Sequence, residues 1–392
     1  MKKTLILGMT LNVLLLSIVS LLNDLSSEMI LPILPLFLGS LGASGVALGI
    51  IGGLRDSVAS ILNVFSGYWS DRIGRRKIFV VWGYLSSAVF KLFISTATVW
   101  QQVLVFAGLE RMGKGLRTAP RDAIIADSMG FARGRAFGIH RAFDTTGAIL
   151  GSITGFILLW YFDFSFPAII FAAAVLSFFS LIPLYFVRDV RRKPQHVSLK
   201  IGFSRLPRRL KLFILVASIF TLANFSYFFF VLHAQGLFTG KLALGAPILL
   251  YILFNIVYTV FAIPFGILSD RIGRAKVLVA GYFLFALTCL GFALFYSITA
   301  YVVLFAFYGL VFAMIEGTQR ALVSDLAPRN LRATALGTYH TTIGIIALPA
   351  SIIAGVFWQI APAYTFLYGT IVSLGAVLAF LAFSLRLRKQ AF

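Results

Sequence analysis

The feature that most limits the fold of this chain is a succession of long apolar runs. A bilayer core about 30 Å thick needs roughly 20 apolar residues in a helix, and backbone groups that face lipid must be satisfied within that helix. The sequence is 60% hydrophobic and 12% charged over 392 residues, which indicates an all-α polytopic membrane protein. The runs predict twelve transmembrane helices, near residues 8–38, 44–70, 78–97, 101–128, 135–160, 166–187, 210–237, 245–269, 277–296, 299–326, 333–359 and 363–385.

The positive charges follow the loops, and this pattern predicts how the chain crosses the membrane. Of the 34 Lys and Arg residues, 25 lie at the two ends or in connections of one parity, eight lie inside spans, and only Lys241 lies in the opposite connections. By the positive-inside rule, both termini of this multi-pass protein face the cytoplasm, and we expect it in the plasma membrane. The net charge of +21 does not indicate a nucleic-acid partner, because no aromatic-interleaved basic face accompanies it.

A nine-residue segment occurs twice. Gly67–Arg75 reads GYWSDRIGR and Gly266–Arg274, 199 residues later, reads GILSDRIGR, with seven identities. Each copy joins two apolar runs, and its second glycine suits a tight reversal. The repeat predicts a transporter of two similar halves. The candidate gating residues are Gly67, Asp71, Arg72, Gly74 and Arg75 in the first turn, and Gly266, Asp270, Arg271, Gly273 and Arg274 in the second.

One polar interruption separates the halves. Residues 188–211 are strongly basic and lie between the sixth and seventh apolar runs. We therefore expect an N-terminal six-helix bundle over 1–187, a cytoplasmic linker over 188–211 and a C-terminal six-helix bundle over 212–392. The basic side chains of the linker also suit contact with an anionic lipid surface.

Three motifs resemble those of the major facilitator superfamily. Gly67–Arg76 is similar to its loop signature between helices 2 and 3, and Gly266–Lys276 is similar to the echo between helices 8 and 9. Arg111, Lys114 and Gly115 match its helix-4 pattern. The glycines of helix 5 follow the spacing of its proton-coupled exporters, with Ser and Phe where that pattern has Pro and Gly; they are Gly138, Gly147, Gly151 and Gly155, with Ser152 and Phe156 as the departures.

The resemblance implies two pseudo-symmetric six-helix bundles and secondary transport by alternating access. It implies a proton gradient as the energy source, no bound cofactor, no enzymatic activity, and efflux as the direction of transport. The partners that we expect are a small-molecule substrate, protons and the lipid bilayer, with the protein as a monomer. The helix-5 glycines are explained equally well by close packing of one helix on another.

The fourth span carries six charged residues between Glu110 and Asp122. Intramembrane charge is costly and marks protein-facing or water-lined positions. At 100° per residue, Glu110, Lys114, Arg117 and Arg121 share one helical face. We expect the binding site here, with Arg111, Lys114, Arg117 and Arg121 shaping it. Spacing of four residues predicts the ion pairs Glu110 with Lys114 and Glu316 with Arg320.

Asp24 is the predicted coupling carboxylate. It lies near the middle of the first span in Asn23-Asp24-Leu-Ser-Ser-Glu28, and that span holds no cation. A desolvated carboxylate gains a proton more readily, whereas a nearby arginine opposes protonation. Substrate or conformation could exchange these two conditions, which is the basis of proton coupling. The candidate coupling and substrate residues are Asp24, Glu28, Arg111, Lys114, Arg117, Arg121, Asp144 and Glu316.

Other functions remain open on the sequence. Asp24 and Glu28 with His140 or His233 would suit nickel or ferrous ions, and Asp24–Met29 with Gly115–Asp122 resembles a branch of the superfamily that includes proposed nickel-resistance exporters. Against a metal site, several cations share the first half of the chain. An organic-anion importer of the same fold is another alternative. An intramembrane enzyme or lipid-handling scaffold is the alternative of a different class, although hydrolase and nucleotide motifs are absent from the sequence.

Overall fold

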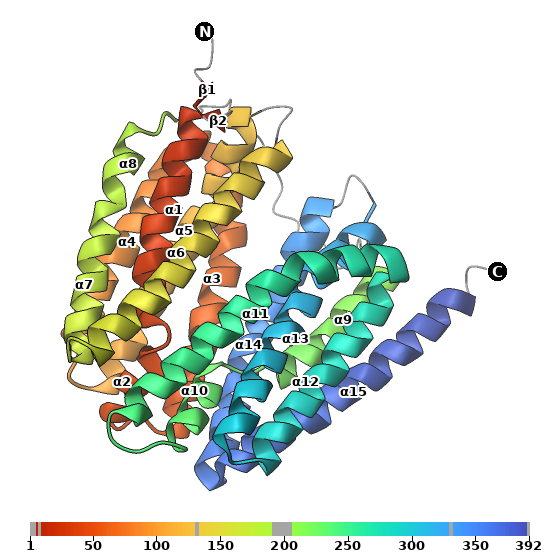
Figure 1. Cartoon of the computed structure of the whole chain (residues 1–392). Coiled ribbons are helices and arrows are strands. Elements are labelled where there is room, and N and C mark those ends of the chain that lie inside the picture. Colours follow the sequence, from red (N-terminus) through yellow and green to blue (C-terminus); the bar gives the residue numbers. More distant parts are fainter. Residues whose placement is uncertain (1–4, 7–8, 130–132, 190–205, 329–331, 390–392) are drawn as a thin grey trace. The chain divides into compact units, whose positions relative to one another are not determined.

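The computed structural model describes the whole chain except residues 1–4, 7–8, 130–132, 190–205, 329–331 and 390–392. This part is almost entirely helical (Figure 1). Its short strands β1 (Leu5–Ile6) and β2 (Met9–Thr10) pair antiparallel just before the first helix. The first span therefore begins as a helix at residue 11 and not at residue 8. Most of the predicted linker lies outside the described residues.

Packing divides the chain into two units, of residues 1–42 with 58–199 and of residues 43–57 with 200–392. Unit 1 contains α1 (Leu11–Ile30), α2 (Leu34–Ser40), the C-terminal part of α3 (Gly45–Ile73), α4 (Lys77–Ser95), α5 (Trp100–Met129), α6 (Arg133–Trp160), α7 (Phe166–Phe179) and α8 (Leu181–Phe186). Unit 2 contains the N-terminal part of α3, α9 (Arg208–Ala223), α10 (Phe228–Gln235), α11 (Leu242–Ile272), α12 (Arg274–Leu294), α13 (Ile298–Leu326), α14 (Arg332–Ile360) and α15 (Pro362–Lys389).

These helices form the twelve predicted spans. Eleven spans in the described part of the chain are long and apolar enough to cross a membrane. The twelfth is α5, which is 30 residues long and contains the charged stretch between Glu110 and Asp122. The all-α fold with six spans on each side of the linker is thus confirmed. The exact division into 1–187, 188–211 and 212–392 stays a prediction, since residues 43–57 pack with the second unit.

Three spans are built from two helices each, and proline explains two of the breaks. Pro32 separates α1 from α2, and Pro183 lies just beyond the break between α7 and α8. Proline lacks a backbone N–H, and its ring clashes with the carbonyl four residues earlier. The third break follows Ala223, the last residue of α9, with Asn224 as its C-cap. There the hydroxyl oxygen of Ser351 accepts a hydrogen bond from the Ser226 backbone N–H at 3.1 Å.

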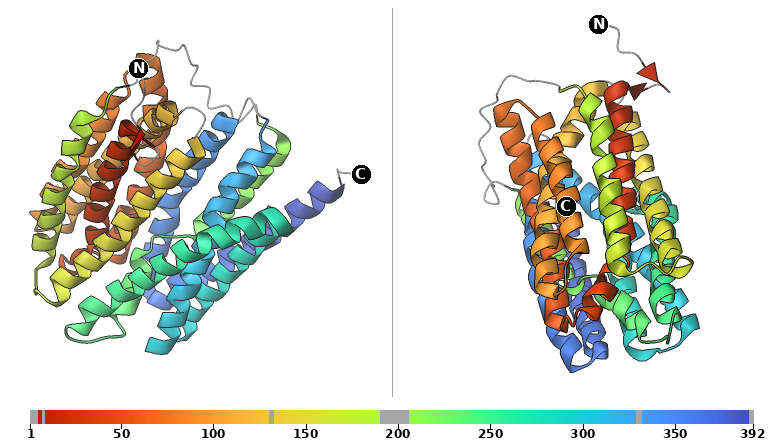
Figure 2. Two further views of the ribbon diagram at one scale, coloured as in Figure 1. Left: turned by 45° about the horizontal axis from the view of Figure 1, so that its top comes forward. Right: turned by 90° about the vertical axis from the view of Figure 1, so that its left-hand side faces the viewer.

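Helices α6 and α1 of unit 1 lie side by side (Figure 2), and three glycines of α6 face the backbone of α1. A Cβ at Gly155 would lie 2.9 Å from the carbonyl oxygen of Met29, and Gly147 and Gly151 face the carbonyl oxygens of Leu21 and Leu25 in the same way. The three glycines therefore let two backbones approach closely, as small residues do between membrane helices. This supports the packing explanation of their spacing.

The interior of unit 2 is aromatic. Phe220 stacks on Tyr282 at 4.0 Å between ring centroids, and Phe230 stacks on Tyr308 at 4.3 Å. The N-terminal part of α3 joins this unit through α14. A Cβ at Gly45 would lie 2.6 Å from the carbonyl oxygen of Gly355. One helical segment near the start of the chain thus completes the packing of the second unit.

Candidate functional site

A buried polar cluster lies between α4 and α5 of unit 1. The Ser87 hydroxyl donates to Glu110 Oε1 at 3.0 Å and accepts from Arg117 Nη1 at 2.9 Å. Glu110 Oε2 also lies 3.2 Å from Arg111 Nε. Glu110, Arg111 and Arg117 are all at least nine-tenths buried. One serine therefore lies between a carboxylate and a guanidinium, in a place where neither meets bulk water.

The predicted pair of Glu110 with Lys114 is wrong. Glu110 pairs with its neighbour Arg111 and with Ser87, whereas Lys114 is exposed. A spacing of four residues allows such a pair. It does not decide whether the side chain of Glu110 turns toward Lys114 or toward the neighbouring helix α4. Arg117 is also held by an aromatic ring, because its guanidinium carbon lies 4.4 Å from the centroid of Tyr84. Such a contact stabilises a cation by about 2 kcal/mol when both groups are desolvated.

Two further ion pairs lie in the same unit. Arg121 Nη2 lies 3.0 Å from Asp122 Oδ1, and Arg121 also donates to the Ser20 hydroxyl on α1 at 3.0 Å. His140 Nε2 lies 3.7 Å from Asp144 Oδ1, one turn along α6. Asp122 and Asp144 are partly buried. Arg121 thus ties α5 to α1, and Asp144 lies beside a histidine of its own helix.

Asp24 lies without an ion pair among the described residues. Its carboxylate accepts a hydrogen bond from the side-chain amide of its neighbour Asn23, at 3.4 Å. The carboxylate is partly buried, and it attracts the charges of Lys91, Lys114 and Arg117 electrostatically. Glu28, one turn further along α1, is also partly buried. Asp24 therefore lies in the field of several cations and forms an ion pair with none of them in the described structure.

Lys91 of α4 was not among the predicted site residues, and the structure buries it between α4, α1 and α7. It is 2% exposed, and its Nζ donates to the hydroxyls of Ser26 and Ser27 at 2.9 Å each and of Ser177 at 3.5 Å. We call Ser26, Ser27 and Ser177 the serine cage. A lone lysine in an apolar run is a sequence signal for a functional position. Its serine partners lie on α1 and α7, so their contact with Lys91 is seen only in the folded structure.

Glu316 belongs to unit 2. As predicted, it pairs with Arg320 one turn along α13, and it also accepts a hydrogen bond from the Tyr258 hydroxyl of α11. Arg320 is exposed and Glu316 is partly buried. The remaining predicted coupling and substrate residues all lie in unit 1.

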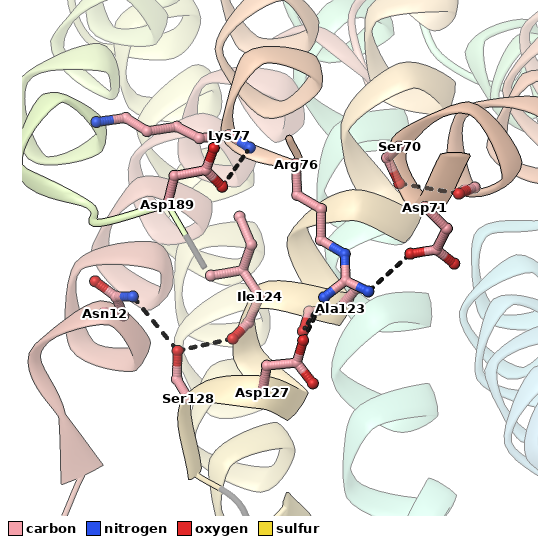
Figure 3. Close-up of polar contacts among 11 residues, drawn as sticks. Asn12, Ser70, Asp71, Arg76, Lys77, Ala123, Ile124, Asp127, Ser128 and Asp189 are labelled. Carbon is pink, nitrogen blue, oxygen red and sulfur yellow. Dashed lines mark hydrogen bonds and ion pairs between the residues drawn. The ribbon is translucent and has the colours of Figure 1, made fainter. Parts of the chain in front are cut away.

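The first repeated turn forms an ion-pair triad (Figure 3). Arg76 donates to Asp71 at 2.7 Å and pairs with Asp127 at the end of α5. We call Arg76, Asp71 and Asp127 the first latch. Burial alone would lower the pKa of Arg76, but the hydrogen bonds and attraction of both carboxylates raise it above its ordinary value. Arg76 therefore stays charged at neutral pH, and its contribution is lost with rising pH only above the usual arginine range.

The second turn has an equivalent triad, which the repeated segment alone did not predict. Arg274 lies 2.9 Å from Asp270 and pairs with Asp325 at the end of α13. We call these residues the second latch. In the second copy, Ala275 stands at the position of Arg76, and Arg274 stands at the position of Arg75. Arg274 takes over the interaction, so the change to alanine does not remove it. Side-chain exposure is 10% for both Arg76 and Asp127, against 24% for Arg274 and 52% for Asp325.

The other turn residues lie as follows. Gly74 and Gly273 have φ of +71° and +98°, which confirms the tight reversal. Arg72 is exposed and donates to the Tyr68 hydroxyl at 3.2 Å. Arg75 and Arg271 are exposed, and Gly67 faces Ala119 of α5, whereas Gly266 has open space beside it. Asp127 and Asp325 are the residues that sequence reasoning missed, because each is paired only through the fold.

The start of the linker is held beside the first latch (Figure 3). Asp189 accepts a hydrogen bond from the Lys77 backbone N–H at 3.3 Å, where α4 begins. Asn12 exchanges two hydrogen bonds with the backbone of Arg188, each at 3.0 Å. The chain leaving α8 is therefore fixed to the beginnings of α1 and α4.

The metal alternative finds no support in the described part of the chain, which brings no three His, Cys, Asp or Glu side chains into a metal-binding group. His140 contacts Asp144 and lies 3.5 Å from the Ser17 hydroxyl. His233 lies in unit 2 among aromatic rings and contacts the carbonyl oxygen of Phe292 at 3.0 Å.

Comparison with known proteins gives a consistent result. A family model described as Major Facilitator Superfamily matches residues 16–247 and 241–391. The chain is 50% identical over 377 residues to the uncharacterized MFS-type transporter MJ1317 of Methanocaldococcus jannaschii, with 94% of each chain covered. It is 32% identical over 160 residues to the multidrug resistance protein MdtH of Yersinia enterocolitica, covering 40% of this chain and 39% of MdtH.

The crystal structure of the nucleoside transporter NupG superimposes with a TM-score of 0.78. It is 16% identical and covers 95% of this chain and 98% of NupG. At this identity the likeness concerns the fold alone.

Proposed function

Because this chain belongs to the Major Facilitator Superfamily, we propose that it is a proton-coupled secondary transporter that exports a small organic solute by alternating access. It is a multi-pass membrane protein, as its apolar helices require. We place it in the plasma membrane as a monomer with both termini in the cytoplasm. The proton gradient supplies the energy, and no cofactor is needed.

The observation that carries the proposal is the position of Asp24. Carboxylates within membrane helices are rare and often belong to proton relays, and this one forms no ion pair in the described structure. It also lies in the field of Lys91, Lys114 and Arg117. In the proposed cycle, a modest movement of these cations relative to Asp24 changes whether the carboxylate holds a proton. Proton uptake would thereby be linked to conformation.

Asp144 and Glu28 belong to the same unit, and we propose that they contribute to the polar path around Asp24. Arg111, Lys114, Arg117 and Arg121 would shape the substrate site. Lys114 is the member of this group that is exposed, so we assign it the first contact with solute. Arg117 and Glu110 are engaged with Ser87, and they would set the position of α5. Glu316 would act from unit 2.

Proteoliposomes test the proposal with defined probes. Ethidium represents the drugs suggested by the relation to MdtH, uridine represents the nucleosides suggested by NupG, and benzoate represents organic anions. An imposed pH gradient should drive transport of at least one probe in the wild type. Asp24→Asn should reduce gradient-driven transport about tenfold or more while solute exchange continues. Unchanged gradient-driven transport in Asp24→Asn would remove this residue from the coupling mechanism.

The same vesicles address the lipid-handling alternative. A fluorescent phospholipid placed in one leaflet reports flipping in parallel. Lipid movement without transport of any probe would replace the proposal. Nickel ions, added as a further probe, report on metal export.

An organic anion is the second candidate substrate, and one observation favours it. The carboxylates Glu110, Asp122 and Asp144 of unit 1 each have a cationic or histidine partner, whereas Lys91, Lys114 and Arg117 lie without a carboxylate at ion-pair distance in the described structure. An anionic solute would supply the missing charge. Gradient-driven transport of benzoate without transport of ethidium or uridine would select this candidate.

A further inference from the structure

The serine cage around Lys91 combines deep burial with neutral partners. Lys91 Nζ has three donor positions, and the cage offers three hydroxyl oxygens to accept them. Among the described residues, no carboxylate lies within ion-pair distance of this ammonium group. Keeping an ammonium group buried without a counter-ion is costly, and lysines act as proton acceptors and donors at such sites in other proteins.

The hydrogen bonds of the cage suit a neutral amine as well as an ammonium. The hydrogen of the Ser26 hydroxyl is used by the Ala173 carbonyl oxygen at 2.6 Å, and that of Ser177 is directed to Asn23 Oδ1 at 3.4 Å. These two serines can therefore only accept from Lys91. Within the described structure the Ser27 hydroxyl bonds to Lys91 alone, so its hydrogen is available to rotate. If Lys91 loses a proton, Ser27 can donate to the free electron pair on the nitrogen.

The cage also connects Lys91 to Asp24. Lys91 donates to Ser177, Ser177 donates to Asn23 Oδ1, and Asn23 Nδ2 donates to Asp24 Oδ1 at 3.4 Å. The two ionisable groups are thus held at opposite ends of one chain of hydrogen bonds. A change of charge at either end reorients the groups between them, because hydrogen-bonded chains polarise one another.

The charges that face Lys91 from the surrounding helices nearly balance. Helix α5 contributes Glu110, Arg111 and Arg117, and α1 contributes Asp24, with Glu28 one turn further on. Helix α7 has no ionisable side chain, and α8 contributes only Tyr185, which is exposed beside Lys77. On α4 itself, Tyr84 is occupied with Arg117. The nearby carboxylates Glu110 and Asp24 are therefore offset by the cations Arg111 and Arg117.

We propose that Lys91 is a second proton-carrying residue of the transport cycle, acting together with Asp24. In one state its ammonium donates to all three serines. In the other state one Nζ–H bond has broken, the electron pair has stayed on nitrogen, and the proton has left to a water molecule. Ser27 then donates to the amine. The proposal rests on the proton-coupled transport proposed above and adds a cationic carrier to the acidic one.

Nitrogen NMR tests the first half of the proposal without any solute. The full-length protein, labelled with 15N-lysine in lipid nanodiscs, gives a side-chain signal for Lys91 that is identified by its loss in Lys91→Met. We expect this signal to change from the ammonium to the amine form as the pH is raised to about 9, where exposed lysines stay charged. A signal that stays in the ammonium form over the whole range overturns the proposal.

Transport by two variants tests the second half. Lys91→Arg keeps a charge that does not leave the guanidinium, and Lys91→Gln keeps hydrogen bonding without a charge. In both variants we expect pH-gradient-driven transport of the probes used above to fall about tenfold or more, with exchange of the same probe retained. Lys241→Gln, an exposed change of the same type, should leave both activities unaltered.

The outcomes are separable. Wild-type activity in Lys91→Arg overturns the proposal, and so does loss of exchange in both variants, which would show a structural role. If the wild type itself shows no gradient-driven transport, the proposed coupled function fails. The lysine titration still decides in that case whether Lys91 releases a proton.

Discussion

Ser87 illustrates how one small side chain holds a buried pair of opposite charges. Its hydroxyl serves Glu110 and Arg117 at once, and both partners are almost fully removed from water. Loss of one partner of a buried charged group costs about 1 to 3 kcal/mol or more, because the group left behind is desolvated without compensation. The function of this serine is therefore to keep two costly groups satisfied.

We expect Ser87→Ala to lower the free energy of unfolding by about 1 to 3 kcal/mol, since Glu110 and Arg117 each lose a hydrogen bond. Thermal unfolding of the purified protein in detergent measures this. Ser86→Ala is the matched control, because the neighbouring Ser86 donates only to the carbonyl oxygen of Gly83 in its own helix, at 3.3 Å. Equal stability of the two variants would contradict the bridging role of Ser87.

The two latches lead to a comparison between equivalent carboxylates. Asp127→Asn should weaken the first latch by about 1 to 3 kcal/mol, because the pair with Arg76 is largely buried. Asp325→Asn should weaken the second by at most about 1 kcal/mol, because that pair is half exposed and screened by solvent. We therefore expect transport turnover to fall more in Asp127→Asn, with probe binding retained in both. Loss of binding with normal turnover would show that the latches do not govern the balance of conformations.

At the scale of helices, the glycine face of α6 sets the distance to α1. Gly151 lies against the backbone of Leu25, whereas Gly138 on the same helix has open space, with no atom within 4 Å of the place that a Cβ would take. Gly151→Ala should lower the free energy of unfolding by about 1 to 3 kcal/mol through overpacking. Gly138→Ala should leave stability unchanged or raise it by up to about 1 kcal/mol, since alanine favours the helix. Thermal unfolding of both variants measures the contrast, and the same effect in both would contradict it.

The positions of the spans could be predicted from hydropathy, because every helix that crosses a bilayer must be apolar over a fixed length. The breaks were less predictable. Pro32 and Pro183 signal two of them, but at the break after Ala223 the backbone N–H of Ser226 bonds to Ser351 of another helix, a contact that no local sequence pattern reveals. The sequence also indicated Gly74 and Gly273 correctly, since only glycine adopts their positive φ without strain.

Interacting pairs of side chains within the site could be predicted only where both residues lie on one helix. Glu316 and Arg320 lie one turn apart and do pair. Glu110 and Lys114 have the same spacing, yet Ser87 on α4 draws Glu110 away. Lys91 with its cage and the pairs formed by Asp127 and Asp325 join residues from different helices. Without the fold, no local pattern identifies such contacts.

At the scale of the whole molecule, the loop charges predict which connections face the cytoplasm. In a Cys289→Ala background, Lys241→Cys should react with an impermeant maleimide in intact cells, whereas Lys276→Cys should react only after the membrane is opened. Both lysines are exposed. Lys241 directly precedes the start of α11, and Lys276 lies in the first turn of α12, just after the other end of α11. The reverse labelling pattern would show that the cation asymmetry has been interpreted with the wrong orientation.

The division of α3 between two units has a consequence for the synthesis of the chain. Ser57 donates to the carbonyl oxygen of Gly344 at 2.5 Å, across 287 residues of sequence. Residues 43–57 are therefore made early, but their partner surface on α14 is made almost last. Until then, the glycine-rich face that includes Gly45 has no partner, because the α14 residues it packs against, such as Gly355, have not been made. A chain whose synthesis stops before α14 would contain the complete first half, but the N-terminal part of α3 would lack the helix on which it packs.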